Sequence, residues 1–104
     1  MKVVISYRKI SNKRLPIAGY SLHGYTDKNG NPVITKAIVK ADPLLKKKDN
    51  IRLARVILKH ESDEAIARSK GLPLREADKL ARSKEPRWFR NKYRTHIQLL
   101  QALR

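Results

Sequence analysis

Apolar side chains recur with one spacing before Asp42-Pro43 and with another after it, and this change limits the folds that the chain can adopt. Within residues 1–42, apolar and polar side chains alternate in several runs, as they do in strands. Within residues 43–104, apolar residues recur at the three- and four-residue spacing of helices. The sequence therefore predicts a single α+β domain, in which an N-terminal three-stranded antiparallel sheet packs with a C-terminal half of three to four helices.

A hairpin between residues 17–25 and 33–40 is the most specific local signal in the sheet half. The segment Asp27-Lys28-Asn29-Gly30 separates these two runs. Asp and Asn side chains bond their own backbone in turns, and glycine accepts a positive φ at low cost. Residues 33–40 are rich in β-branched side chains, which favours a strand. We therefore expect an antiparallel hairpin with Gly30 in its turn, and a further strand over residues 2–8.

Capping residues and a glycine set the first helix boundaries. Asp42-Pro43 has the form of an N-cap followed by proline at the first helical position. Residues 51–59 carry a broad apolar arc, which is typical of a largely buried central helix. Ser62-Asp63-Glu64 predicts the start of a second helix, because it offers a capping hydroxyl and two acids near the positive end of the helix dipole. Gly71 is expected to end that helix.

Two further helices are predicted to begin at prolines. Pro73 opens a helix that runs to about Ser83, and the last helix runs from near Pro86 almost to the C-terminus as one element. We expect the apolar side of this last helix to consist of Phe89, Tyr93, Ile97, Leu100 and Leu103.

The charge of the chain points to a negatively charged partner. Lys and Arg number 25 against 9 Asp and Glu, which gives a net charge of +16, and a compact chain of this charge repels itself. The absence of cysteine excludes disulfides and cysteine-built zinc sites. The sequence has no apolar run long enough to span a membrane, and MKVVISYRKI does not resemble a signal peptide. We expect a cytoplasmic protein with no membrane partner.

The predicted nucleic-acid contacts lie on the last two helices, where cations and aromatic rings are interleaved. Phosphate backbones attract cations spaced along a surface, and bases stack on aromatic faces. Phe89 and Tyr93 are expected in the core, whereas Trp88 is left open between edge packing and contact with a base or partner. The predicted contact residues are Arg75, Lys79, Arg82, Lys84, Arg87, Trp88, Arg90, Lys92 and Arg94.

Two other segments offer weaker signals for nucleic-acid contact. Residues 62–83 have the outline of a helix-turn-helix, although Lys70 and Pro73 depart from its usual pattern. Lysines also follow the predicted hairpin, where a sheet presented to a duplex groove is a known mode of recognition. For the first segment an ordinary helical corner is the preferred interpretation, and for the second it is a strand whose lysines face solvent.

The segment His60-Glu61-Ser62-Asp63-Glu64 is the only acidic cluster. A metal-dependent nuclease needs carboxylates that converge on a cation, whereas acids in the first turn of a helix are splayed around its axis. Capping and the helix dipole explain them without catalysis. We therefore predict no catalytic residue, no metal site and no cofactor. A small metal-independent ribonuclease that uses Tyr93, Arg94 and His96 is an alternative that nothing in the spacing demands.

The sequence favours a small, basic, non-enzymatic nucleic-acid-binding protein. Duplex DNA is slightly preferred over RNA, because aromatic residues make up only 6% of the chain and readers of single strands usually display more exposed rings. One alternative is a regulator or inhibitor, for example a phage-encoded modulator, that docks its basic surface on an acidic or nucleic-acid-processing host protein. A second alternative is a small nuclease.

Overall fold

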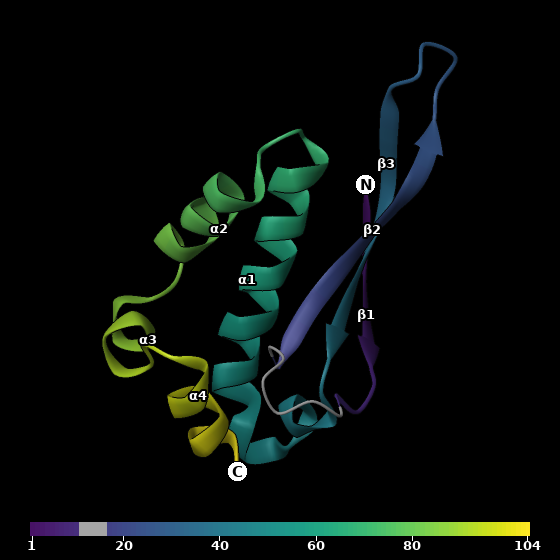
Figure 1. The fold of residues 1–104 in the computed structure, drawn as a ribbon. Coiled ribbons are helices and arrows are strands. Elements are labelled where there is room, and N and C mark those ends of the chain that lie inside the picture. The colour runs from purple at the N-terminus through teal and green to yellow at the C-terminus, as the bar shows by residue number, and fades with distance from the viewer. Residues whose placement is uncertain (11–16) are drawn as a thin grey trace.

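The computed structural model describes residues 1–10 and 17–104 and shows an α+β fold. Three strands, β1 (Lys2–Tyr7), β2 (Ala18–Thr26) and β3 (Pro32–Ala41), form a sheet of order β1-β3-β2. The helices that follow all lie on one side of this sheet (Figure 1). The predicted fold class and the antiparallel hairpin of β2 and β3 are confirmed.

The sheet is mixed, because β1 runs parallel to β3. The expectation that all three strands are antiparallel is therefore wrong for β1. Its register pairs Lys2 with Lys36 and Tyr7 with Ala41. Alternation in a sequence indicates which side chains share a face of a strand, but it carries no information about direction. Here β3 lies between β1 and β2, so β1 and β2, which follow one another in the chain, form opposite edges of the sheet.

The turn of the hairpin has the predicted chemistry. Gly30 has a φ of 81°, and the Asp27 carboxylate accepts hydrogen bonds from the backbone N–H groups of Asn29 and Asn31, each at 2.9 Å. No atom lies within 4 Å of the position that a Cβ on Gly30 would occupy. A side chain at this position is therefore disfavoured by backbone conformation alone.

Replacing Gly30 with valine is expected to lower the free energy of unfolding by about 1–2 kcal/mol, because a β-branched residue is forced to a positive φ. Asparagine tolerates this conformation, so Gly30→Asn is the matched control and should cost less. Urea unfolding of both variants measures the difference. Equal stability of the valine variant and the parent would contradict the turn geometry.

The helical half begins as the capping residues predict. Two short 3-10 helices, η1 (Pro43–Lys46) and η2 (Lys48–Asn50), precede the central helix α1 (Ile51–Ser69). The Asp42 carboxylate accepts the backbone N–H of Leu44 at 2.9 Å, with Pro43 in the first position. Gly71 follows α1 with a φ of 99°.

The central helix is continuous where the sequence predicted two helices. The expected start at Ser62 is wrong: its hydroxyl donates to the Leu58 carbonyl at 2.8 Å, in the middle of α1. A serine inside a helix can bond the carbonyl four residues earlier instead of capping. Residues 51–69 contain neither glycine nor proline, so nothing stops the helix there.

The last predicted helix is two helices, α3 (Arg87–Lys92) and α4 (His96–Leu103), which follow α2 (Leu74–Ser83). A capping box, in which the Thr95 hydroxyl accepts the N–H of Gln98 and the Gln98 side chain accepts the N–H of Thr95, begins α4. The expected continuous helix from Pro86 is therefore wrong, because this box starts a new helix with a new orientation.

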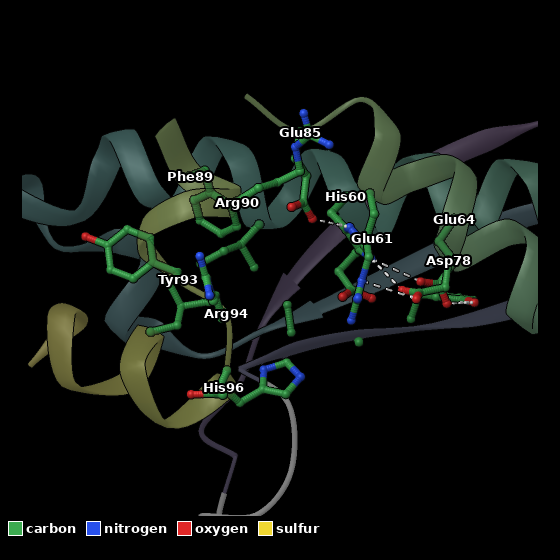
Figure 2. A pocket seen from close by; sticks show the side chains of 17 residues that line it. His60, Glu61, Glu64, Asp78, Glu85, Phe89, Arg90, Tyr93, Arg94 and His96 are labelled. Carbon is green, nitrogen blue, oxygen red and sulfur yellow. Dashed lines mark hydrogen bonds and ion pairs between the residues drawn. The ribbon is translucent and has the colours of Figure 1, made fainter. Parts of the chain in front are cut away.

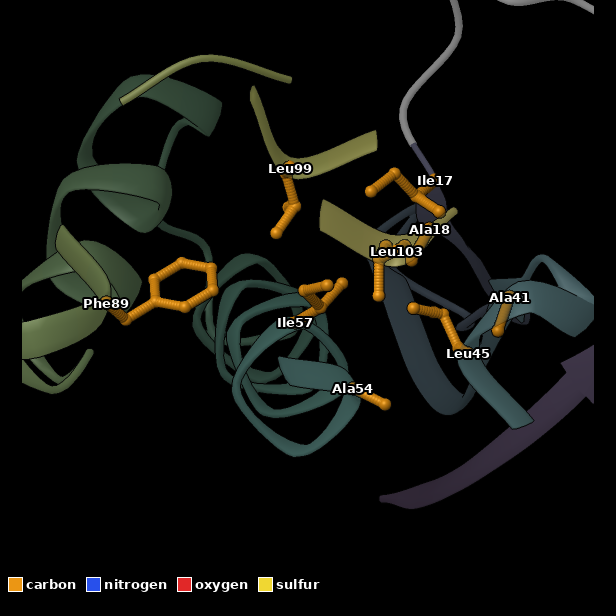
Figure 3. Close-up of a cluster of buried hydrophobic side chains, with 9 residues drawn as sticks. All are labelled: Ile17, Ala18, Ala41, Leu45, Ala54, Ile57, Phe89, Leu99 and Leu103. Carbon is orange, nitrogen blue, oxygen red and sulfur yellow. The ribbon is translucent and has the colours of Figure 1, made fainter. Parts of the chain in front are cut away.

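The core lies between the sheet and α1 and is closed at one end by α3 and α4. Figure 3 shows the cluster that joins these elements. The cluster consists of Ile17, Ala18, Ala41, Leu45, Ala54, Ile57, Phe89, Leu99 and Leu103. Across the described ranges, none of the helices combines the length and apolarity needed to traverse a bilayer.

Candidate functional site

A pocket of about 590 Å³ opens between α1, the start of β2 and the chain from α2 to α4 (Figure 2). Its size is within the range of about 300–1,000 Å³ that is usual for ligand sites. Four carboxylates line it: Glu61, Glu64, Asp78 and Glu85. Five residues with basic side chains also line it: His60, Arg82, Arg90, Arg94 and His96. A chain with only nine acidic residues and a charge of +16 thus places four carboxylates around one space.

One face of α1 supplies the acidic side of the pocket. Ile57, His60, Glu61 and Glu64 all line it, and their spacing of three, four and seven residues places them on one face of a continuous helix. Asp63 lies on another side, where its carboxylate pairs with the Lys59 ammonium at 2.7 Å. Because α1 is continuous, Glu61 and Glu64 lie on the same face of one helix. A helix that started at Ser62 would have placed them on different sides of its first turn.

His60 lies between three carboxylates. Its Nδ1 is 2.6 Å from Glu85 Oε1, and its Nε2 is 3.2 Å from both Glu64 Oε2 and Asp78 Oδ1. Because both ring nitrogens face acceptors, the geometry indicates an imidazolium that donates from both. Burial by itself lowers the pKa of His60, but the charges of Glu61 and Glu85 and the hydrogen bond to Glu85 outweigh it and raise the pKa.

The His60 network extends to the sheet and to α2. The Tyr20 hydroxyl donates to Glu64 Oε1 at 2.6 Å, and burial together with this hydrogen bond raises the pKa of Tyr20 to about 12. On the other side, Arg82 Nε is 3.4 Å from Asp78 Oδ2. Glu64, Asp78 and Glu85 therefore each have a charged partner, and these residues come from α1, α2 and the segment between α2 and α3.

Glu61 differs from the other three carboxylates. It is half-buried, and none of the hydrogen bonds and ion pairs within residues 1–10 and 17–104 involves its side chain. Burial raises its pKa to about 7, an effect that the neighbouring charges of Glu64 and Asp78 reinforce and that of His60 opposes. A carboxyl group that is half-ionised near neutral pH can accept and release a proton there.

The same cluster is also a candidate for a metal ion. His60, Glu64 and Asp78 each offer an atom within 4.8 Å of the others. A histidine ligand must be neutral and must present a lone pair to the metal. Nε2 of His60 faces Glu64 and Asp78, and Nδ1 faces Glu85, so a cation would take the place of the proton on Nε2, and the N–H at Nδ1 would keep its carboxylate partner. Without a cation, the imidazolium balances the negative charge of the cluster.

The predicted cations are all exposed, and three of them reach the pocket. Arg82, Arg90 and Arg94 lie on its rim, whereas the remaining five lie elsewhere on α2 and α3 or between them. These five are Arg75, Lys79, Lys84, Arg87 and Lys92. Among the eight, Arg82 alone forms an ion pair with a residue of the described ranges. The surface is therefore free to meet external negative charge.

Of the two aromatic residues expected in the core, Phe89 is buried, whereas Tyr93 is only half-buried and packs against the core as Trp88 does. Phe89 is buried, and its ring contacts the rings of Trp88 and Tyr93 at centroid distances of 5.8 and 5.4 Å. Trp88 is half-buried, and the Arg52 guanidinium lies 4.0 Å from the centre of its ring. One face of the indole is therefore covered by a cation–π contact.

Sequence reasoning missed the acidic half of the pocket. The signal was present in the spacing of His60, Glu61 and Glu64, which a continuous helix places together, and in the capping box at Thr95, which turns His96 toward the pocket. Comparison of the chain with protein-family models, curated proteins and solved structures finds no match.

Proposed function

We propose that this protein binds nucleic acid by neutralising phosphates with the exposed cations of α2, α3 and the segments that flank them. The supporting observation is that all eight cations are exposed, and among them Arg82 alone is paired with an acid of the described ranges. Cations spaced along a surface match the spacing of backbone phosphates and release their counterions on binding.

The arginines at the pocket rim support phosphate as the charge that is recognised. A guanidinium binds phosphate through two parallel hydrogen bonds, which an ammonium cannot do. Arg90 and Arg94 lie on either side of Tyr93 at the end of α3, and both line the pocket. A phosphate bound there would lie over a space large enough for the attached nucleotide.

Binding should depend steeply on salt. If about six phosphates are contacted, log K should fall with log salt with a slope of about −5. Fluorescence anisotropy on duplex DNA and on single-stranded RNA measures this slope for both. A slope of zero on both, together with tight binding to a single host protein, would contradict the proposal and support the protein-docking alternative.

The triple variant Arg87→Ala, Arg90→Ala, Arg94→Ala should bind at least about ten-fold more weakly at moderate salt, and its salt slope should shrink by about 3 if each arginine meets one phosphate. The matched control removes the same charge elsewhere, as Lys46→Ala, Lys47→Ala, Lys48→Ala around η1 and η2. The control should lose less affinity. Equal losses would show that net charge, and not the surface of α3, governs binding.

A further inference from the structure

The pocket places a half-buried carboxyl group and an exposed imidazole on different sides of one arginine-lined space. Glu61 comes from the middle of α1 and His96 from the first turn of α4, and Arg94 lies two residues before His96. Figure 2 shows Glu61 on the α1 side and Arg94 and His96 on the side formed by the chain between α3 and α4. A phosphate held by the arginines would therefore lie between a carboxyl group and an imidazole.

We propose that this pocket is the active site of a metal-independent ribonuclease, in which Glu61 is the general base, His96 the general acid, and Arg90 and Arg94 bind the scissile phosphate. The inference rests on the proposed function, because the RNA must first be held by its phosphates. It departs from the expectation of a non-enzymatic protein, and it assigns a role to the acidic half of the pocket, which phosphate binding alone leaves unexplained.

The reaction needs no group beyond those in the pocket. The Glu61 carboxylate takes the proton of a ribose 2′-hydroxyl, and the O2′ oxygen forms a bond to the adjacent phosphorus. The bond from phosphorus to the O5′ oxygen of the next nucleotide breaks, and the His96 imidazolium gives its proton to that oxygen. The products are a 2′,3′-cyclic phosphate and a 5′-hydroxyl. The arginines stabilise the charge that develops on the phosphate oxygens.

The environment of Glu61 suits a base, and His96 supplies the exposed imidazole that the acid role needs. With its pKa raised to about 7, Glu61 is ionised in part of the molecules at neutral pH and is basic enough to take a proton. His96 is exposed at the start of α4, and histidine is the residue that most often acts as a general acid or base in enzymes. His60 is unsuited to this role, because its N–H groups are engaged by three carboxylates.

The remaining charged groups of the pocket hold this arrangement. The titratable or charged side chains that line the pocket together with Glu61 are Tyr20, His60, Glu64, Asp78, Arg82, Glu85, Arg90, Tyr93, Arg94 and His96. Glu64, Asp78 and Glu85 are tied to His60, which leaves Glu61 as the carboxyl group without a fixed partner in the described part of the chain. RNA, and not DNA, is the substrate class, because the mechanism uses the 2′-hydroxyl as nucleophile.

The test measures cleavage and binding separately, with a labelled single-stranded RNA in excess EDTA. We expect the parent to produce 2′,3′-cyclic phosphate ends, and to bind but not cleave the same sequence with 2′-O-methyl riboses. Glu61→Gln should cleave about 10²–10⁴-fold more slowly and keep its affinity for the methylated RNA. Glu76→Gln makes the same change on an exposed residue of α2 outside the pocket and should cleave like the parent.

Every other outcome would overturn the ribonuclease, and one of them would overturn the proposed function as well. Binding of RNA without cleavage would overturn the ribonuclease and leave the proposed function standing, whereas failure to bind either DNA or RNA would overturn both. Cleavage that requires added magnesium or manganese, or a Glu61→Gln preparation as active as the parent, would also overturn the proposal. A thermal melt establishes that Glu61→Gln is folded. As a second measurement on the parent, the cleavage rate should fall as the pH drops below about 7, where Glu61 becomes protonated.

Discussion

Replacing His60 with alanine is expected to lower the free energy of unfolding by about 3–5 kcal/mol, the usual cost of removing one partner from a buried ion pair. The His60 side chain is 14% exposed, and those of Glu64 and Glu85 are 9% and 13% exposed. Without the imidazolium, these carboxylates stay desolvated with no positive charge between them. Urea unfolding at constant salt measures the loss, and His23→Ala, at an exposed histidine of β2, is the matched control.

The penalty should also depend on pH in one direction. Because the folded-state pKa of His60 lies above its ordinary value of 6.5, the stabilisation from its charge is fully present below that value. It is lost as the pH rises through the raised pKa. The difference in stability between the parent and His60→Ala should therefore shrink as the pH rises above 6.5. A difference that is constant or grows over this range would show that His60 is not charged in the folded protein.

The fold was easier to predict than the site, because several of its signals act between residues that are close together in the chain. The hairpin turn and the caps at Asp42 and Gly71 depend on local chemistry, in which a residue acts on its own backbone or on near neighbours. Such signals can be read from the sequence, and the structure bears them out. The direction of β1 depends instead on its pairing with β3, more than thirty positions away in the chain, and no local pattern specifies it.

The acidic side of the pocket was not predicted, because the sequence placed a helix boundary at Ser62 where the structure has none. Ser62-Asp63-Glu64 has the composition of a helix start, but the carbonyl of Leu58 was available to the Ser62 hydroxyl. Both arrangements satisfy the hydroxyl, so the local sequence alone does not distinguish them; the packing of α1 against β2 and β3 does. Once α1 is continuous, His60, Glu61 and Glu64 share one face. Glu85 and Asp78 then arrive from other elements, which a sequence pattern could not foresee.

The second large effect on stability is expected in α4, the helix that begins at the Thr95 capping box. Replacing Leu103 with alanine is expected to cost about 2–5 kcal/mol, the range for a buried leucine. Leu103 is 1% exposed and packs in the cluster of Figure 3. Its carbonyl also accepts the Asn50 side-chain amide at 2.9 Å, which holds the end of α4 against the start of α1. A loss of packing here should therefore loosen the contact between these two helices.

Ile97→Ala is the control that tests how the last two helices are arranged. A single helix from Pro86 would place Ile97 and Leu103 on the same apolar side, so both substitutions would destabilise. In the structure α4 begins anew at His96, and Ile97 is 69% exposed, so its replacement should change stability by less than about 0.5 kcal/mol. Urea unfolding of the two variants decides between these arrangements. If they lost stability equally, the face that α4 buries would be wrong, and with it the orientation that brings His96 to the pocket.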